Sequence, residues 1–200
     1  MERPTENRRI ILGIDPGTNR MGYGILSVTG NRLQVVTLGD IDLHAIRDPY
    51  RKLRYIFDRV GMLVDEYRPG EVALESPFFG ENVQSMLKLG RAQGVAMAAA
   101  LSRDVAVFEY APRRIKQSIT GRGGAAKEQV AALLKSMLGI DYNPRRLDAT
   151  DGLAVAVCHY FVSSSPFGES HGLPVKKSRP KGITWERFLK ENPDREVKTK

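Results

Sequence analysis

Four carboxylates stand out because of where they fall in the chain. Asp15 follows a short apolar run, and Glu75 closes a second one. Asp148 and Asp151 are three residues apart at the start of an expected helix, so they lie on one face of it. A carboxylate at the end of a buried strand costs free energy unless something compensates its charge. A divalent cation would compensate all four together.

The donor set indicates which cation this would be. Hard oxygen ligands without a cluster of His and Cys indicate Mg²⁺, with Mn²⁺ as a substitute. Two such ions about 4 Å apart are the standard arrangement for in-line displacement at phosphorus. One ion helps to generate the attacking hydroxide, and the other stabilises the leaving oxygen. His159 follows Asp151 by two helical turns, and we interpret it as structural.

Each carboxylate taken alone has another interpretation. Asp15 in Asp-Pro-Gly could begin a turn, and Asp148 could cap the N-terminus of its helix. Glu75, which Ser-Pro follows, has the weakest alternative. The four together, in this order and on these elements, favour a metal site over any single alternative.

The apolar periodicity predicts an α/β fold. Three strands come first and form an antiparallel meander, because turn residues separate them. Helices and strands then alternate, which indicates a mixed sheet with helices on its faces. The expected strands are 9–14, 23–28, 33–38, 71–75 and 105–110, and the expected helices are 49–68, 82–102, 112–119, 125–138 and 148–162.

The length favours one domain and a tail. Two hundred residues suffice for one sizeable core. The composition changes to Ser, Pro, Gly and Lys after Ser163, so we expect a folded domain at 1–163 and a basic, partly flexible tail at 164–200. Residues 171–200 hold nine Lys and Arg and four Asp and Glu, so they carry +5 of the net charge of +8. The total charge is therefore weak evidence about the domain.

The sequence also predicts a cellular location. No apolar run approaches the roughly 20 residues that span a bilayer, and residues 1–9 lack the apolar core of a signal peptide. The one cysteine, Cys158, excludes an intramolecular disulfide and a cysteine-rich zinc site. We expect a cytoplasmic protein.

A basic segment is the strongest local signal for nucleic acid. Between Pro112 and Lys127 there is no acidic residue, and glycines interleave the cations. Such a loop can lay cations and backbone N–H groups along phosphates, although a solvated basic surface has the same composition. The candidate DNA-binding cations are Arg113, Arg114, Lys116, Arg122 and Lys127.

A family resemblance joins these observations. The chain resembles the RuvC family of Holliday-junction resolvases over about residues 9–163, in several motifs that follow one another at compatible spacings. These motifs are Ile14-Asp-Pro-Gly-Thr18 with Gly22-Tyr-Gly24, Ala73-Leu-Glu75, Leu87-Lys-Leu-Gly-Arg-Ala-Gln-Gly94, Val107-Phe-Glu-Tyr-Ala111 with Ile115-Lys-Gln117, and Asp148-Ala-Thr-Asp-Gly-Leu-Ala154. The resemblance implies a ribonuclease-H-like fold with a mixed five-stranded sheet flanked by helices.

The resemblance also implies a function. It implies a homodimer that binds four-way junction DNA and nicks two strands of like polarity symmetrically in recombination and repair. Each subunit would use one two-metal site and leave 5′-phosphate and 3′-hydroxyl ends, and RuvA and RuvB would be branch-migration partners.

By position, the resemblance implies roles for individual residues. Asp15, Glu75, Asp148 and Asp151 match the metal-binding carboxylates. Phe78 and Phe79 match a position where an aromatic residue stacks on or wedges between bases, a contact worth roughly 1–3 kcal/mol. Lys116 and Lys127 match basic positions that act near the scissile phosphate.

Three other functions compete with this interpretation. Gly13-Ile-Asp-Pro-Gly-Thr18 also resembles the first phosphate loop of actin- and Hsp70-like ATPases, but 200 residues leave no room for their second domain. A non-catalytic DNA-binding module would leave the four carboxylates unexplained. A related nuclease could instead cut structured RNA, although the helix at 82–102 favours the resolvase.

Overall fold

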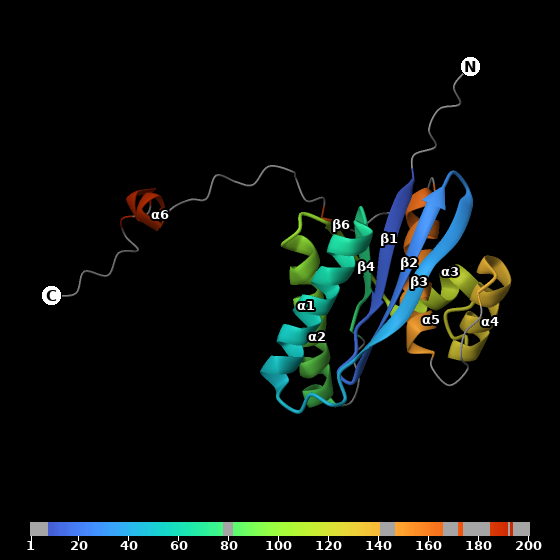
Figure 1. Cartoon of the computed structure of the whole chain (residues 1–200), viewed down its shortest axis with the longest axis horizontal. Coiled ribbons are helices and arrows are strands. Elements are labelled where there is room, and N and C mark those ends of the chain that lie inside the picture. The colour runs from blue at the N-terminus through green and yellow to red at the C-terminus, as the bar shows by residue number, and fades with distance from the viewer. Residues whose placement is uncertain are drawn as a thin grey trace, which may run out of the picture.

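The computed structural model describes residues 8–77, 82–140, 147–165, 172–173, 185–191 and 193. Within these ranges one sheet separates two layers of helices (Figure 1). Phe78 and Phe79, the predicted base-stacking residues, lie outside the described residues.

The sheet has the order β3-β2-β1-β4-β5-β6. Its first three strands form the predicted antiparallel meander, β1, β4 and β5 are parallel, and β6 pairs antiparallel to β5. The five-stranded mixed sheet is therefore confirmed, and the two-residue β6 adds to its edge. The strands are β1 Arg9–Asp15, β2 Arg20–Thr29, β3 Arg32–Asp42, β4 Glu71–Glu75, β5 Ala106–Tyr110 and β6 Gly172–Leu173.

Helices cover both faces of the sheet. α1 and α2 lie on one face, and α3, α4 and α5 lie on the other (Figure 1). Each predicted helix is present within a few residues of its expected ends. The helices are α1 Pro49–Tyr67, α2 Val83–Leu101, α3 Pro112–Thr120, α4 Lys127–Leu138, α5 Asp148–Ser164 and α6 Trp185–Glu191.

The core has two halves because the side chains of a strand alternate between the faces of its sheet. Leu12 of β1 is buried with α1 and α2, whereas its neighbour Ile11 is buried with α4 and α5. α5 is the most deeply buried helix, with a central run from Leu153 to Cys158 at 2% exposure or less. It therefore forms the second half of the core together with the sheet.

Local sequence explains where α1 begins and ends. The Asp48 side chain accepts a hydrogen bond from the Arg51 backbone N–H at 2.7 Å, and Pro49 follows in the first turn. The helix ends at Arg68, whose φ of 47° is left-handed, before Pro69. The N-terminal end of α1 lies beside the loop that follows β1, because Lys52 donates to the Thr18 carbonyl oxygen.

The tail is only partly described. Gly172–Leu173 pairs with β5, so a piece of residues 164–200 contacts the sheet. The division of the chain at residue 163 remains a prediction. None of the described helices is long and apolar enough to cross a bilayer.

Candidate active site

The parallel pairing of β1 and β4 brings two predicted carboxylates together. The register pairs Gly13 with Ala73 and Ile14 with Leu74. Asp15 and Glu75 are the next residues in this register and end their strands. The two side chains therefore lie side by side at the carboxyl edge of the sheet.

α5 supplies the other two carboxylates from its first turn. Asp148 is the first residue of the helix and Asp151 the fourth, while Leu147 occupies the N-cap position. The alternative interpretation of Asp148 as an N-cap is therefore wrong. Glycines allow α5 to lie against the sheet, because a Cβ at Gly22 would overlap the Asp148 carbonyl oxygen and a Cβ at Gly13 would overlap the Gly152 carbonyl oxygen. This close packing brings the start of α5 beside the ends of β1 and β4.

The carboxylates affect one another's protonation. Burial, followed by the neighbouring carboxylates of Glu75 and Asp151, raises the pKa of Asp15 to about 8. Burial and then Asp151 raise the pKa of Glu75 to about 7. Burial also raises the pKa of Asp151, against the opposing effect of Lys127. Burial and neighbouring negative charge thus make ionisation of the cluster unfavourable unless a cation compensates it.

One cation partly compensates this charge. Lys127, the first residue of α4, places its Nζ 2.5 Å from Asp151 Oδ2. Lys127 and Lys116 also line a cavity of about 140 Å³ together with Glu75 and Asp151. Both lysines lower the pKa of Glu75 through their charge. The two predicted lysines of the basic segment are therefore at the carboxylates.

The carboxylates also lack the geometry of a formed metal site. Among the described residues, no three His, Cys, Asp or Glu side chains are arranged to hold one ion. The Lys127 ammonium already binds an oxygen of Asp151. Even so, an all-oxygen donor set with raised pKa values fits a hard divalent cation.

The remaining predicted cations do not reach the carboxylates. Arg113 and Arg122 are exposed in α3 and in the loop between α3 and α4. Arg114 acts electrostatically on Tyr110 and Cys158. These three arginines keep their predicted role in DNA binding as a proposal.

His159 is structural, as its spacing from Asp151 indicates. It is fully buried, and its Nδ1 lies 2.6 Å from the Tyr110 hydroxyl oxygen. Its Nε2 lies 3.3 Å from Glu71 Oε2 and 3.2 Å from Arg9 Nη2. Arg9 and Glu71 begin β1 and β4, so this network is at the opposite end of the strands from Asp15.

Sequence reasoning missed two residues that hold the site in place. Lys52 of α1 donates to the Thr18 carbonyl oxygen at 2.8 Å, which fixes the loop after Asp15. Gln93 of α2 donates to Glu109 Oε1 at 2.7 Å and to the Glu75 carbonyl oxygen at 3.4 Å. Lys52 has no local sequence signal. The signal at Gln93 is a polar residue at a core position of a helix rich in alanine.

Several known proteins resemble this chain in sequence. The family model described as "Crossover junction endodeoxyribonuclease RuvC" matches residues 11–159. A RuvC protein of Cytophaga hutchinsonii is 55% identical over 96% of this chain and 89% of its own length. A RuvC protein of Porphyromonas gingivalis is 54% identical over 94% of this chain and 96% of its own length.

Solved structures of a RuvC protein also resemble this chain. Thermus thermophilus RuvC superposes with a TM-score of 0.69 at 31% identity, over 77% of this chain and 95% of that one. The same protein solved in complex with a Holliday junction substrate gives a TM-score of 0.72 at 31% identity, over 78% of this chain and 94% of that one.

The sheet order, the helical layers and the carboxylates at the strand ends define a ribonuclease-H-like nuclease fold. The match to the family model and the sequence identity to its members show to which family within this fold class the chain belongs. The chain belongs to the RuvC family of crossover junction endodeoxyribonucleases, and it is an enzyme of that class.

Proposed function

We propose that this chain resolves Holliday junctions by symmetric, metal-dependent nicking of two strands of like polarity. The observation that carries the proposal is the meeting of Asp15 and Glu75, at the ends of neighbouring strands, with the first turn of α5. The curated relatives are named as crossover junction enzymes, and the Thermus thermophilus relative was solved with a Holliday junction substrate.

Two Mg²⁺ ions, with Mn²⁺ as a substitute, would be held by Asp15, Glu75, Asp148 and Asp151. When bound, the ions would supply an activated water and stabilise the charge that develops on the phosphate. The raised pKa values of Asp15 and Glu75 support this assignment, because burial and then neighbouring carboxylates disfavour their charged forms, and a divalent cation would stabilise those forms.

Lys127 and Lys116 would bind the phosphate that is cut. Lys127 and a divalent cation compete for the Asp151 carboxylate, because both bind it through positive charge. Once displaced, the Lys127 ammonium remains at the cavity that it shares with Lys116 and can pair with a phosphate oxygen. Lys127 therefore replaces one anionic partner by another when substrate and metal bind.

The cut would leave 5′-phosphate and 3′-hydroxyl ends. Hydroxide forms a bond to phosphorus while the bond from phosphorus to the 3′ oxygen breaks, and that oxygen takes up a proton. The fragment downstream of the cut keeps the phosphate on its 5′ oxygen. Such ends can be rejoined by ligation without further processing, as recombination and repair require.

Two symmetric nicks require two sites, so we propose a homodimer with two-fold symmetry. α2 offers an uncovered apolar face for the second copy. Val83, Leu87 and Leu101 lie on one side of this helix with exposed fractions of 64%, 54% and 43%.

The remaining substrate contacts rest on the resemblance and on the basic segment, and the branch-migration partners rest on the resemblance. Phe78 and Phe79 would act at the bases of the junction centre, and Arg113, Arg114 and Arg122 along the arms. RuvA and RuvB are the proposed branch-migration partners, and the cytoplasm is the proposed location.

Cleavage of synthetic DNA tests the proposal. A four-way junction and a linear duplex of the same sequence are incubated with the protein in Mg²⁺ or in EDTA. Paired nicks in opposite arms of the junction, which DNA ligase seals and which EDTA abolishes, are expected. Equal nicking of the linear duplex, or ends that ligase cannot seal, would contradict it.

A further inference from the structure

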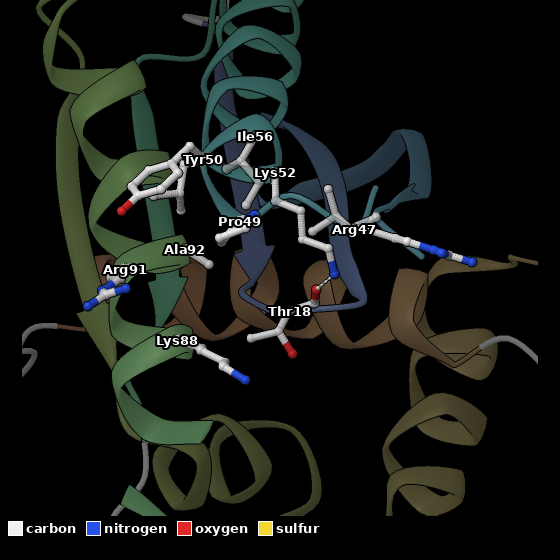
Figure 2. Close-up of a pocket in the computed structure, with 11 residues that line it drawn as sticks. Thr18, Arg47, Pro49, Tyr50, Lys52, Ile56, Lys88, Arg91 and Ala92 are labelled. Carbon is white, nitrogen blue, oxygen red and sulfur yellow. Dashed lines mark hydrogen bonds between the residues drawn. The ribbon is translucent and has the colours of Figure 1, made fainter. Parts of the chain in front are cut away.

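A cavity of about 370 Å³ opens between the N-terminal end of α1 and the middle of α2. We call it the α1–α2 pocket, and Figure 2 shows the residues that line it. It borders Thr18, in the loop that follows Asp15. None of the functions proposed above uses this pocket.

The lining of the α1–α2 pocket combines positive charge with an apolar floor. Leu43, Ile56 and Ala92 are buried beneath it. Its cations are Arg47, Lys52, Lys88 and Arg91, and no Asp or Glu is among its lining residues. The ion pairs of the described residues all involve other cations, so these four are not neutralised by a described carboxylate. The pocket therefore favours a ligand with both an apolar surface and negative charge.

Tyr50 adds a flat aromatic surface to this pocket. It is the second residue of α1, and 78% of it is exposed. In Figure 2 its ring and the Arg91 side chain lie on the α2 side of the opening, Lys88 follows on the same helix, and Arg47 extends on the other side. An exposed aromatic ring beside cations is the arrangement with which proteins stack a base and hold its phosphates.

The position of the pocket relates it to the carboxylates. Lys52 ties the α1 side of the pocket to the Thr18 carbonyl oxygen, three residues beyond Asp15. The pocket lies on the face of the sheet that α1 and α2 cover, whereas Lys116 and Lys127 belong to helices on the other face. The carboxylates at the strand ends thus have cations on both sides. A DNA strand with one phosphate at the carboxylates can continue from Lys116 and Lys127 across the strand ends into the pocket.

We infer that the α1–α2 pocket binds a nucleotide of the substrate DNA near the cut. The Tyr50 ring stacks on the base, and Lys88 and Arg91 bind the flanking phosphates. This inference rests on the proposed function, because it takes DNA to be the substrate. It assigns Tyr50, Lys88 and Arg91 to substrate binding and gives them no part in the chemical step.

Junction affinity measured in EDTA, where no cleavage is expected, tests the inference. Fluorescence anisotropy gives the Kd at several salt concentrations for wild type, Tyr50→Ala, Tyr50→Phe and the double variant Lys88→Gln/Arg91→Gln. Tyr50→Ala is expected to weaken binding about tenfold while Tyr50→Phe stays near wild type, because stacking needs the ring and not the hydroxyl. The double variant should also lower the slope of log K against log salt by about 1.5, as two phosphate contacts are lost.

Matched controls separate this effect from general charge and from assembly. Arg32→Gln/Arg59→Gln removes the same charge outside the pocket, and it should leave the Kd within about twofold of wild type. Sedimentation velocity on the Lys88→Gln/Arg91→Gln protein should give the wild-type oligomeric state.

The outcomes distinguish the inference from the proposed function. If wild type cuts junctions but Tyr50→Ala and the double variant bind as wild type does, the pocket assignment is wrong and the proposed function stands. An equal loss in the Arg32→Gln/Arg59→Gln control would also overturn the assignment. A wild-type protein that neither binds nor cuts a junction would overturn the proposed function and the pocket assignment together.

Discussion

The Lys127 ammonium lies 2.5 Å from Asp151 Oδ2, at the edge of a cluster of carboxylates in which burial and then neighbouring charges raise the pKa values of Asp15 and Glu75. Lys127 is the first residue of α4 and Asp151 lies in the first turn of α5. The pair therefore joins the basic segment to the proposed metal site. It places one positive charge where metal and phosphate would both bind.

Replacing Lys127 should have opposite effects on metal binding and on cleavage. Lys127→Gln removes a cation that competes with Mg²⁺ for Asp151, so half-maximal cleavage should need less Mg²⁺. The comparison is made at pH 9, where protons compete only weakly with Mg²⁺ for the carboxylates. The maximal rate should fall by about 100-fold, because a cation at the phosphate is lost. Cleavage rates over a Mg²⁺ titration measure both quantities. Lys127→Arg is the charge-matched control, and an unchanged maximal rate for Lys127→Gln would show that Lys127 does not act on the phosphate.

The pKa values of Asp15 and Glu75 predict how stability depends on pH. Both pKa values are raised in the folded protein, that of Asp15 from 3.8 to about 8 and that of Glu75 from 4.5 to about 7. Between about pH 4 and about pH 8 the folded state binds more protons than the unfolded state. In EDTA the free energy of unfolding should therefore fall as the pH rises through this range. Each proton contributes a slope of at most about 1.4 kcal/mol per pH unit.

Thermal unfolding between pH 5 and pH 8.5 checks this. The gain in Tm on adding Mg²⁺ should be largest at high pH, where the carboxylates are ionised. Asp15→Asn should flatten the pH dependence in EDTA. A metal-induced gain that is larger at pH 5 than at pH 8 would contradict the assignment of the carboxylates.

The close packing of α5 on the sheet gives a third prediction. Gly13→Ala should lower the free energy of unfolding by about 3 kcal/mol, because the added Cβ overlaps the Gly152 carbonyl oxygen and pushes the helix away. Gly70→Ala is the control, since nothing lies within 4 Å of the new Cβ there. Urea denaturation measures both variants. Equal stability of the two proteins would mean that the helix can shift at no cost.

The exposed face of α2 gives a fourth prediction. Leu87→Glu/Leu101→Glu should convert a dimer to a monomer, because charged side chains would enter the proposed interface. The monomer should nick a junction on one strand at a time, and the paired nicks should be lost. Analytical ultracentrifugation and product mapping check this. A double variant that remains dimeric would place the interface elsewhere.

Much of this fold could be predicted from the sequence because its signals are local. The spacing of apolar residues fixed the helices, and the apolar runs before Asp15 and Glu75 located the strands that carry them. β2 and β3 extend beyond their predicted ends, because Gly22 and Gly39 interrupt the apolar pattern while strand pairing continues past them.

The contacts that complete the site could not be predicted, because they join residues far apart in the chain. Lys127 with Asp151, Lys52 with Thr18 and Gln93 with Glu109 each depend on how layers of the fold pack together. The sequence motifs identified the carboxylates by type and order. They contained no information on which cation lies against which carboxylate.

Binding and cleavage measured on the same proteins test whether these carboxylates hold the metal for junction cleavage. Wild type, Asp15→Asn and Asp151→Asn are compared on one four-way junction, with the Kd measured in EDTA and nicking measured in Mg²⁺. Each variant should bind the junction at least as tightly as wild type, because no phosphate contact is lost. Each should cut it at least about 1,000-fold more slowly, because a metal ligand is lost. Nicking by either variant at the wild-type rate would show that these carboxylates do not hold the catalytic metal.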